Sequence, residues 1–144
     1  MPHYTTVLAA IDLTEESRQV LEKARDLAGG SPLSVIYVSQ PLAQLYGGEI
    51  GMSLGTVEAD LQKQANDLLA ARVKDFDVTA DRQHVAIGNP AAEIRRVAAE
   101  ISANLIVIGT HSRHGLGLLL GSTANGVLHG TSCDVLAVRI DTGG

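Results

Sequence analysis

Short apolar runs alternate along the chain with longer amphipathic segments. Most of the apolar runs are continuous, which is typical of strands buried on both faces of a sheet. The predicted strands occupy residues 5–11, 33–38, 81–87, 104–108 and 135–138. Helices are predicted between them over residues 15–28, from 57 to about 75, from 90 to about 101, and over 122–128.

The residues at the predicted helix ends agree with this pattern. Asn89 followed by Pro90 is a favourable helix start, with Asn as the cap and Pro at the first position. The pair Gly29-Gly30 ends the first helix, and Thr56 is a candidate N-cap of the second. The predicted apolar face of that second helix comprises Val57, Leu61, Ala65, Leu68 and Leu69.

Strands that are joined by helices lie parallel, with right-handed crossovers that cover both faces of the sheet. We therefore predict one α/β domain over residues 1–144, a five-stranded parallel sheet of the Rossmann-like kind with helices on both sides. In such sheets ligands bind beyond the carboxyl ends of the strands, at the point where the strand order reverses.

Composition and charge narrow the function classes. Hydrophobic residues make up 45% of the chain and charged residues 19%, which is too apolar for a disordered chain. Eleven Lys and Arg against sixteen Asp and Glu give a net charge of −5, and aromatic residues are only 3%. Nucleic acids are bound by clustered cations and aromatic platforms, so we expect no nucleic-acid partner.

The sequence also bears on location. The single cysteine, Cys133, cannot form a disulfide within the chain, which fits a reducing compartment. The first residues lack a basic segment that leads into an apolar stretch, and no apolar run approaches the ~18 residues of a membrane span. We therefore expect a cytoplasmic protein without a membrane partner.

The glycine-rich segment 109–122 is the main candidate for ligand binding, because it follows a predicted buried strand and runs into a helix. Glycines let the backbone approach a ligand, and Gly121-Ser122 at a helix start adds the positive end of the helix dipole. Cationic or donor side chains are available nearby from His111, Arg113 and His114. Together these features suit phosphate; the alternative is a loop that only connects strand to helix.

Other chemistries find less support. No Gly-Lys-Ser/Thr sequence occurs, which excludes a P-loop NTPase, and the glycine spacing is off by one from the dinucleotide pattern. No Gly-x-Ser-x-Gly elbow of a hydrolase is present. His111 and His114, with His129 further along, have no Cys or acidic partner fixed nearby, so we predict no metal site. No catalytic residue is assigned.

Three polar features have a structural interpretation. Cys133 is predicted to be a small buried residue rather than a nucleophile, because nothing in the neighbouring sequence supplies what activates a catalytic thiolate. Arg95 and Arg96 are predicted to form a solvated helix face. Asp12 closes the first predicted strand and is a favoured residue for capping the following helix, a role compatible with facing a ligand.

Several sequence features belong together. They are the opening strand that ends in Asp12, the strand 33–38, Gly88-Asn89-Pro90 before a helix, the run 105–111, Gly121-Ser122 and the closing run 133–138. With these features the whole chain resembles the universal stress protein family, small cytosolic α/β proteins found widely in bacteria. The resemblance implies the strand order 3-2-1-4-5 and a dimer, commonly formed through the last strand. Many members bind ATP with the pattern Gly-x2-Gly-x9-Gly-Ser/Thr.

The resemblance also implies site residues. In nucleotide-binding members an acidic residue after the first strand holds the ribose, which corresponds to Asp12, and the end of the second strand contacts adenine, which corresponds to Val38. Gly109 matches the first glycine of the motif, and Gly121 and Ser122 match its last pair. The candidate nucleotide site also includes Ser112, Arg113 and His114.

The chain departs from the ATP motif at two points. Ser112 stands where the second glycine is expected, and eight residues rather than nine separate it from Gly121. A serine in left-handed backbone costs on the order of 1–2 kcal/mol. The missing residue matters more, because it shortens the loop that wraps the phosphates. We therefore expect weak or absent ATP binding.

The leading hypothesis is a dimeric stress-response protein, regulatory or protective, with a degenerate site for ATP or AMP and with Mg²⁺ only alongside ATP. The homodimer is expected through Val135, Leu136 and Val138, because an unpaired strand edge is a template for a partner strand. The alternatives are a slow nucleotide or phosphoester hydrolase that uses His111 or His114, and a nucleotide-free protein-interaction module.

Overall fold

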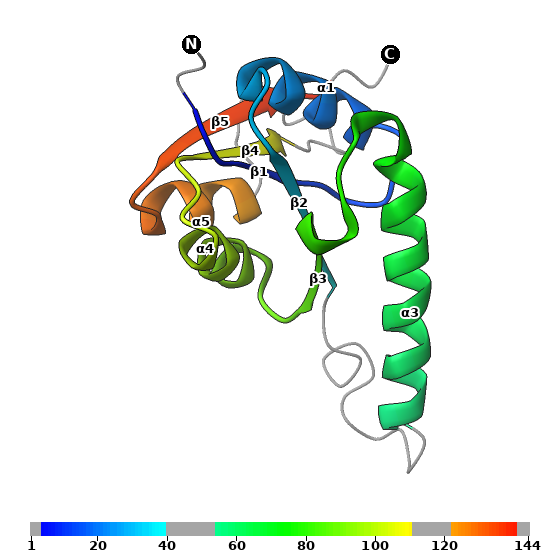
Figure 1. Ribbon diagram of the computed structural model, residues 1–144. Coiled ribbons are helices and arrows are strands. Elements are labelled where there is room, and N and C mark those ends of the chain that lie inside the picture. The colour runs from blue at the N-terminus through cyan, green and yellow to red at the C-terminus, as the bar shows by residue number, and fades with distance from the viewer. Residues whose placement is uncertain (1–3, 40–53, 111–121, 141–144) are drawn as a thin grey trace.

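The computed structural model describes residues 4–39, 54–110 and 122–140. In this part of the chain, five parallel strands form one sheet in the order β3-β2-β1-β4-β5 (Figure 1). The strands are β1 (Val7–Ala10), β2 (Leu33–Ser39), β3 (Gln83–Ile87), β4 (Leu105–Thr110) and β5 (Asp134–Arg139). The helices are α1 (Ser17–Ala28), α3 (Leu54–Arg72), α4 (Pro90–Glu100) and α5 (Ser122–Gly130), with 3-10 turns at Lys74–Phe76 and Ala80–Arg82. The predicted fold class and the implied strand order are both confirmed.

The central strand β1 lies between β2 and β4. Its residue Val7 is opposite Leu33 of β2 and Leu105 of β4. The chain adds β2 and β3 on one side of β1, then β4 and β5 on the other. The strand order therefore reverses between β1 and β4, and the carboxyl ends of these two strands are where such a sheet binds ligands.

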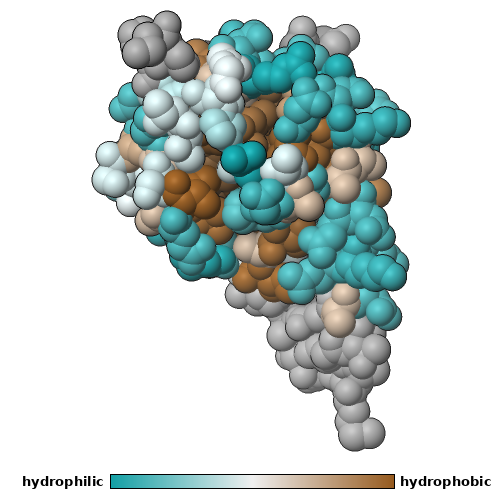
Figure 2. All heavy atoms as spheres, in the orientation of Figure 1, coloured by the Kyte–Doolittle hydropathy of each residue, from teal (hydrophilic) through white to brown (hydrophobic). Residues whose placement is uncertain are grey.

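Alternate residues of β1 belong to different cores. Val7 and Ala9 pack in the cluster formed with α1 and α3, whereas Leu8 and Ala10 pack in the cluster formed with α4 and α5. Figure 1 shows these helix pairs on opposite sides of the sheet. In Figure 2, polar residues dominate the outer surfaces of α1 and α3, and apolar residues gather between the layers, over β2 and β3. Burial on both faces explains why the strands are continuously apolar.

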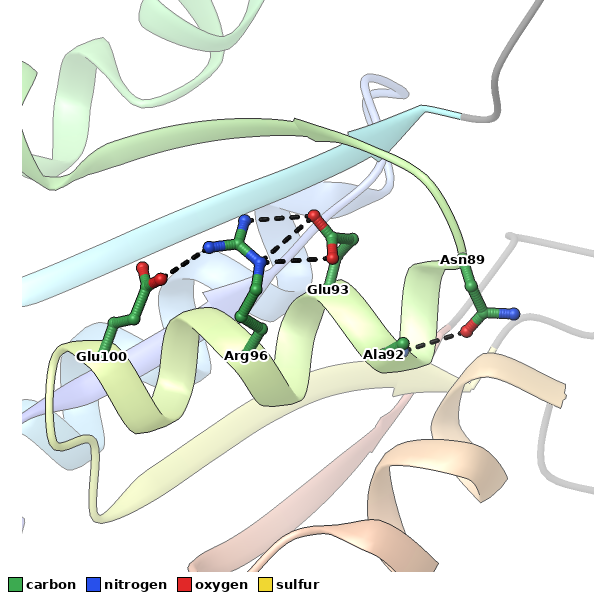
Figure 3. Close-up of polar contacts among 5 residues, drawn as sticks. All are labelled: Asn89, Ala92, Glu93, Arg96 and Glu100. Atoms are coloured by element: carbon green, nitrogen blue, oxygen red, sulfur yellow. Dashed lines mark hydrogen bonds and ion pairs between the residues drawn. The ribbon is translucent and has the colours of Figure 1, made fainter. Parts of the chain in front are cut away.

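Two predicted helix ends are confirmed by local geometry. Asn89 Oδ1 accepts a 3.0 Å hydrogen bond from the N–H of Ala92, and Pro90 opens α4 (Figure 3). α1 ends at Gly29, whose φ of 61° favours glycine and whose N–H donates to Arg25 O at 3.1 Å. Asn89 stands where the start of the helix needs a side-chain acceptor, and Gly29 stands where the backbone needs a positive φ.

α3 differs from its prediction at its start and on its apolar face. Thr56 lies within the first turn of the helix and is not its N-cap. Of the predicted face, Ala65 and Leu69 are buried, but Leu61 and Leu68 are 44% and 51% exposed. Leu61 and Leu68 are two helical turns apart, so they share a side of α3, and the sheet covers a different side.

Arg95 and Arg96 have different surroundings although they are adjacent in the chain. Arg96 is exposed and forms ion pairs with Glu93 and Glu100 along α4 (Figure 3). Arg95 is partly buried, and its Nη1 donates a 2.8 Å hydrogen bond to the carbonyl oxygen of Gly126 in α5. The predicted solvated face is therefore right for Arg96 and wrong for Arg95, which joins two helices.

Candidate ligand site at the carboxyl ends of the strands

A cavity of about 240 Å³ lies at the carboxyl ends of β1, β2 and β4. Its wall is built from the last residues of these strands, from the first turns of α1, α4 and α5, and from Ile140 just after β5. This is the place where the strand order reverses, so the topology and the cavity point to the same site.

Three of the predicted site residues meet in this cavity. Asp12, Val38 and Gly109 all line it, although Asp12 follows β1, Val38 lies in β2 and Gly109 lies in β4. Ser122 is exposed at the start of α5, and its neighbour Thr123 lines the cavity. The remaining predicted residues, Ser112, Arg113, His114 and Gly121, lie outside the described residues, and their roles stay predictions.

The Asp12 carboxylate is held by a local turn. Its Oδ1 accepts a 3.0 Å hydrogen bond from the N–H of Thr14 and a 2.5 Å hydrogen bond from the Thr14 hydroxyl. Glu16, and not Asp12, occupies the N-cap position of α1, so the predicted capping role of Asp12 is wrong. Asp12 instead closes an Asx turn directly after the strand, which orients its carboxylate at the cavity wall.

Gly109 occupies a crowded position in the cavity wall. A Cβ atom there would lie 2.9 Å from Ile140 Cδ1 and 3.1 Å from Val20 Cγ2. Carbon atoms pack at about 3.5–4.0 Å, so a larger residue at this position would have to displace the ends of the Ile140 and Val20 side chains. Packing therefore favours glycine at this position, in addition to any contact with a ligand.

Several wall residues were not predicted from the sequence. Glu16 and Ser17 contribute from the first turn of α1, Tyr37 from β2, and Pro90 and Ile94 from α4. Pro90 was recognised as a helix start, but its place at the site depends on the right-handed return of the chain to the sheet. For Glu16, the position one turn after Asp12 is the signal that could have found it.

The chemistry of the described wall is apolar with a few polar groups. Most of its residues are aliphatic, and its acidic side chains are Asp12 and Glu16. Among the described lining residues none is Lys, Arg or His. The Ser17 hydroxyl donates a 2.7 Å hydrogen bond to Thr14 O, so its proton is used within the turn. Such a wall suits a flat, largely uncharged group that carries hydroxyls.

Other candidate chemistry lies away from the cavity. Within the described residues, no three His, Cys, Asp or Glu side chains are grouped as metal ligands, and His111 and His114 fall outside that part of the chain. Cys133 is partly buried and lies 3.2 Å from the Thr131 hydroxyl, where it packs against the α4 and α5 core. None of the helices in the ranges described is long and apolar enough to cross a membrane.

The fold and the cavity define a small Rossmann-like α/β protein with a ligand site at its switch point. The universal stress protein family matches residues 3–139, and this chain belongs to that family. Universal stress protein A homolog 1 of Coxiella burnetii is 37% identical over 94% of this chain and 96% of its own length. Homolog 2 of the same organism is 38% identical over 97% and 98%. The family resemblance noted in the sequence is thereby confirmed.

Solved structures share the fold at lower identity. The hypothetical protein MJ0577 superposes with a TM-score of 0.78 at 18% identity, covering 97% of this chain and 99% of that one. A universal stress protein in complex with cAMP superposes with a TM-score of 0.61 at 23% identity, covering 94% and 97%. At these identities the likeness establishes the Rossmann-like fold of this chain.

Proposed function

We propose that this protein is a stress-response binding protein that holds an adenine nucleotide weakly in the cavity at the ends of β1, β2 and β4. The observation that carries the proposal is the convergence of Asp12, Val38 and Gly109 on one largely apolar cavity. The residues that the family resemblance assigns to ribose, adenine and phosphate thus come together. A related universal stress protein in complex with cAMP supports a nucleotide as the ligand class.

The size of the cavity favours the nucleoside part of the ligand. Sites for drug-sized molecules occupy roughly 300–1,000 Å³, whereas this cavity is about 240 Å³. It therefore holds the base and sugar and leaves the phosphates outside. Val38, Ile36 and Ile94 supply an apolar surface for the base, and the Asp12 carboxylate accepts a hydrogen bond from a ribose hydroxyl.

The phosphates belong on the β4–α5 side of the cavity in this proposal. Thr123 lines the cavity in the first turn of α5, where the N–H groups and the helix dipole favour an anion. The sequence between Ser112 and Gly121 is one residue shorter than in the ATP pattern. We therefore expect AMP to bind at least as well as ATP, because the outer phosphates of ATP contribute little binding free energy.

Titration calorimetry with AMP, ATP with Mg²⁺, and cAMP tests the proposal.

The variant Asp12→Asn keeps an oxygen that can accept both hydrogen bonds from Thr14 but removes the charge. We expect it to weaken AMP binding about tenfold, the effect of losing a charge-assisted hydrogen bond. Asp26→Asn on the exposed side of α1 is the matched control. Absence of binding by every adenine nucleotide would contradict the proposal, and ATP binding much tighter than AMP binding would contradict the weak phosphate site.

We further propose that the protein is a homodimer through β5. This strand is an edge of the sheet, with Val135 and Leu136 half-buried and Ala137 exposed. Val138, which was also predicted at the interface, is only 9% exposed and packs in the α1 and α3 core. Light scattering after gel filtration should give twice the monomer mass. Ala137→Lys should shift the protein toward the monomer. A monomer mass for the wild-type protein would refute the dimer.

The hydrolase alternative depends on His111 or His114, which lie outside the described residues. No observation on the described wall favours it. We therefore propose a binding protein that acts as a dimer.

A further inference from the structure

Tyr37 is the one aromatic residue among the described residues of the cavity wall. It lies in β2 between Ile36 and Val38, and its side chain is on the opposite face of the sheet from theirs. Tyr37 packs against the α1 and α3 core, whereas Ile36 and Val38 pack in the α4 and α5 core. Because all three residues line the cavity, the cavity borders the carboxyl end of β2 from both faces of the sheet.

The hydroxyl of Tyr37 is available to a ligand. It makes no hydrogen bond to another residue in the described part of the chain, and its oxygen is not buried. The ring is partly buried against the core, so the body of the side chain is held in place while its polar end stays accessible. A phenol hydroxyl in this position can donate a hydrogen bond to a group that occupies the cavity.

Side-chain donors are few on the described wall. Asp12 and Glu16 carry carboxylates, which accept hydrogen bonds, and the Ser17 hydroxyl donates to a carbonyl oxygen within the turn before α1. The hydroxyls of Tyr37 and Thr123 are the side-chain donors that are left among the described lining residues. Thr123 stands in the first turn of α5, on the side proposed for the phosphates. Tyr37 is therefore the described side-chain donor beside the end of β2.

We propose that the Tyr37 hydroxyl donates a hydrogen bond to a ring nitrogen of the adenine base, which makes Tyr37 a specificity-determining residue of the site. The inference rests on the proposed function, which places the base at the end of β2. Ring nitrogens of adenine only accept hydrogen bonds, whereas sugar hydroxyls can also donate them. The base is thus the part of the nucleoside that needs a donor from the wall, and Tyr37 supplies one where the base lies.

The variant Tyr37→Phe tests this contact, because it removes the hydroxyl and keeps the ring that packs against the core. Tyr4→Phe is the matched control. Tyr4 packs against the same core, but it does not line the cavity, and its hydroxyl donates to Asp134 Oδ2 at 2.8 Å. Calorimetry compares AMP with its 1-deaza, 3-deaza and 7-deaza analogues, in each of which a C–H group replaces one ring nitrogen. A thermal melt of each variant verifies folding.

We expect Tyr37→Phe to weaken AMP binding about three- to tenfold, the effect of losing one hydrogen bond between neutral groups, and Tyr4→Phe to leave it unchanged. One deaza analogue should bind wild type more weakly than AMP by a similar factor. That analogue should bind Tyr37→Phe as well as it binds wild type, which identifies the accepting nitrogen.

Two results would overturn the inference while AMP binding still supports the nucleotide site. One is an unchanged AMP affinity in a folded Tyr37→Phe protein. The other is a loss on Tyr37→Phe substitution that is equal for AMP and for all three analogues, because the hydroxyl would then not contact a ring nitrogen. If wild type binds no adenine nucleotide, the proposed function itself fails, and the inference fails with it.

Discussion

The two helical layers of this protein contact their neighbours in different ways. Between α4 and α5 the contact depends on a missing side chain: a Cβ atom on Gly126 would lie 2.7 Å from the Cβ of Ala91. Between α1 and the turn after α3, side chains make the contact instead. The guanidinium carbons of Arg18 and Arg25 lie 5.1 and 5.2 Å from the centre of the Phe76 ring.

The difference shows where each layer tolerates change. The close approach of α4 and α5 leaves no room for larger residues, because interiors pack without spare volume. The α1 and α3 layer uses long side chains at its margin and leaves apolar residues of α3 exposed. We therefore expect mutations at α4 and α5 contacts to cost stability even at half-buried positions, and mutations on the outer side of α3 to cost little.

The largest expected effect separates two adjacent leucines of α3. Leu69 is fully buried in the α1 and α3 core, whereas Leu68 is 51% exposed. Leu69→Ala should lower the free energy of unfolding by about 2–5 kcal/mol, because it leaves a cavity. Leu68→Ala changes the same residue type in the same helix and should cost no more than about 0.5 kcal/mol. Urea denaturation measures both; equal losses would mean that the outer side of α3 is covered in solution.

A smaller effect separates the two adjacent arginines of α4. Arg95→Met removes the hydrogen bond to Gly126 O and should cost about 1–2 kcal/mol of unfolding free energy. Arg96→Met removes exposed ion pairs to Glu93 and Glu100 and should cost at most about 1 kcal/mol. The comparison is made by urea denaturation at low and high salt. A greater loss at Arg96 would show that the surface network, rather than the contact between the helices, holds α4 in place.

The smallest effect concerns pH at the margin of the α4 layer. His84 of β3 lies on the strand face that Ala86 presents to α4, and its Nε2 is buried without a hydrogen-bond partner among the described residues. Burial lowers the pKa of His84 below its ordinary value of 6.5, the charge of Arg96 lowers it further, and Glu100 and Asp81 partly oppose this.

Because the unfolded chain then binds the proton more tightly, the stability that neutral His84 contributes is present above pH 6.5 and is lost as the pH falls through its folded pKa. Thermal melts between pH 5 and pH 8 should show this loss in wild type and a smaller one in His84→Leu. His129→Gln, at an exposed residue, controls for the removal of a histidine. A pH profile of His84→Leu identical to that of wild type would refute the assignment.

Much of the fold could be predicted from the sequence because its signals are local. A continuous apolar run indicates a strand buried on both faces, and Asn89-Pro90 and Gly29 mark helix ends through their own backbone preferences. The candidate site was harder to predict. Asp12 and Val38 follow from family resemblance, but Glu16 and Thr123 join the cavity only because three strand ends and three helix starts meet.

The sequence alone determined the alternation of strands and helices, and hence a parallel sheet with two covered faces, because periodicity and helix-end residues act within a few positions. Tertiary structure decided which of two identical neighbours is buried, as for Leu68 and Leu69 or Arg95 and Arg96. It also decided that Gly109 lies against Ile140 and Val20, where a larger residue would displace their side chains. These outcomes depend on which distant segment lies opposite each residue, and that is set by how the layers pack.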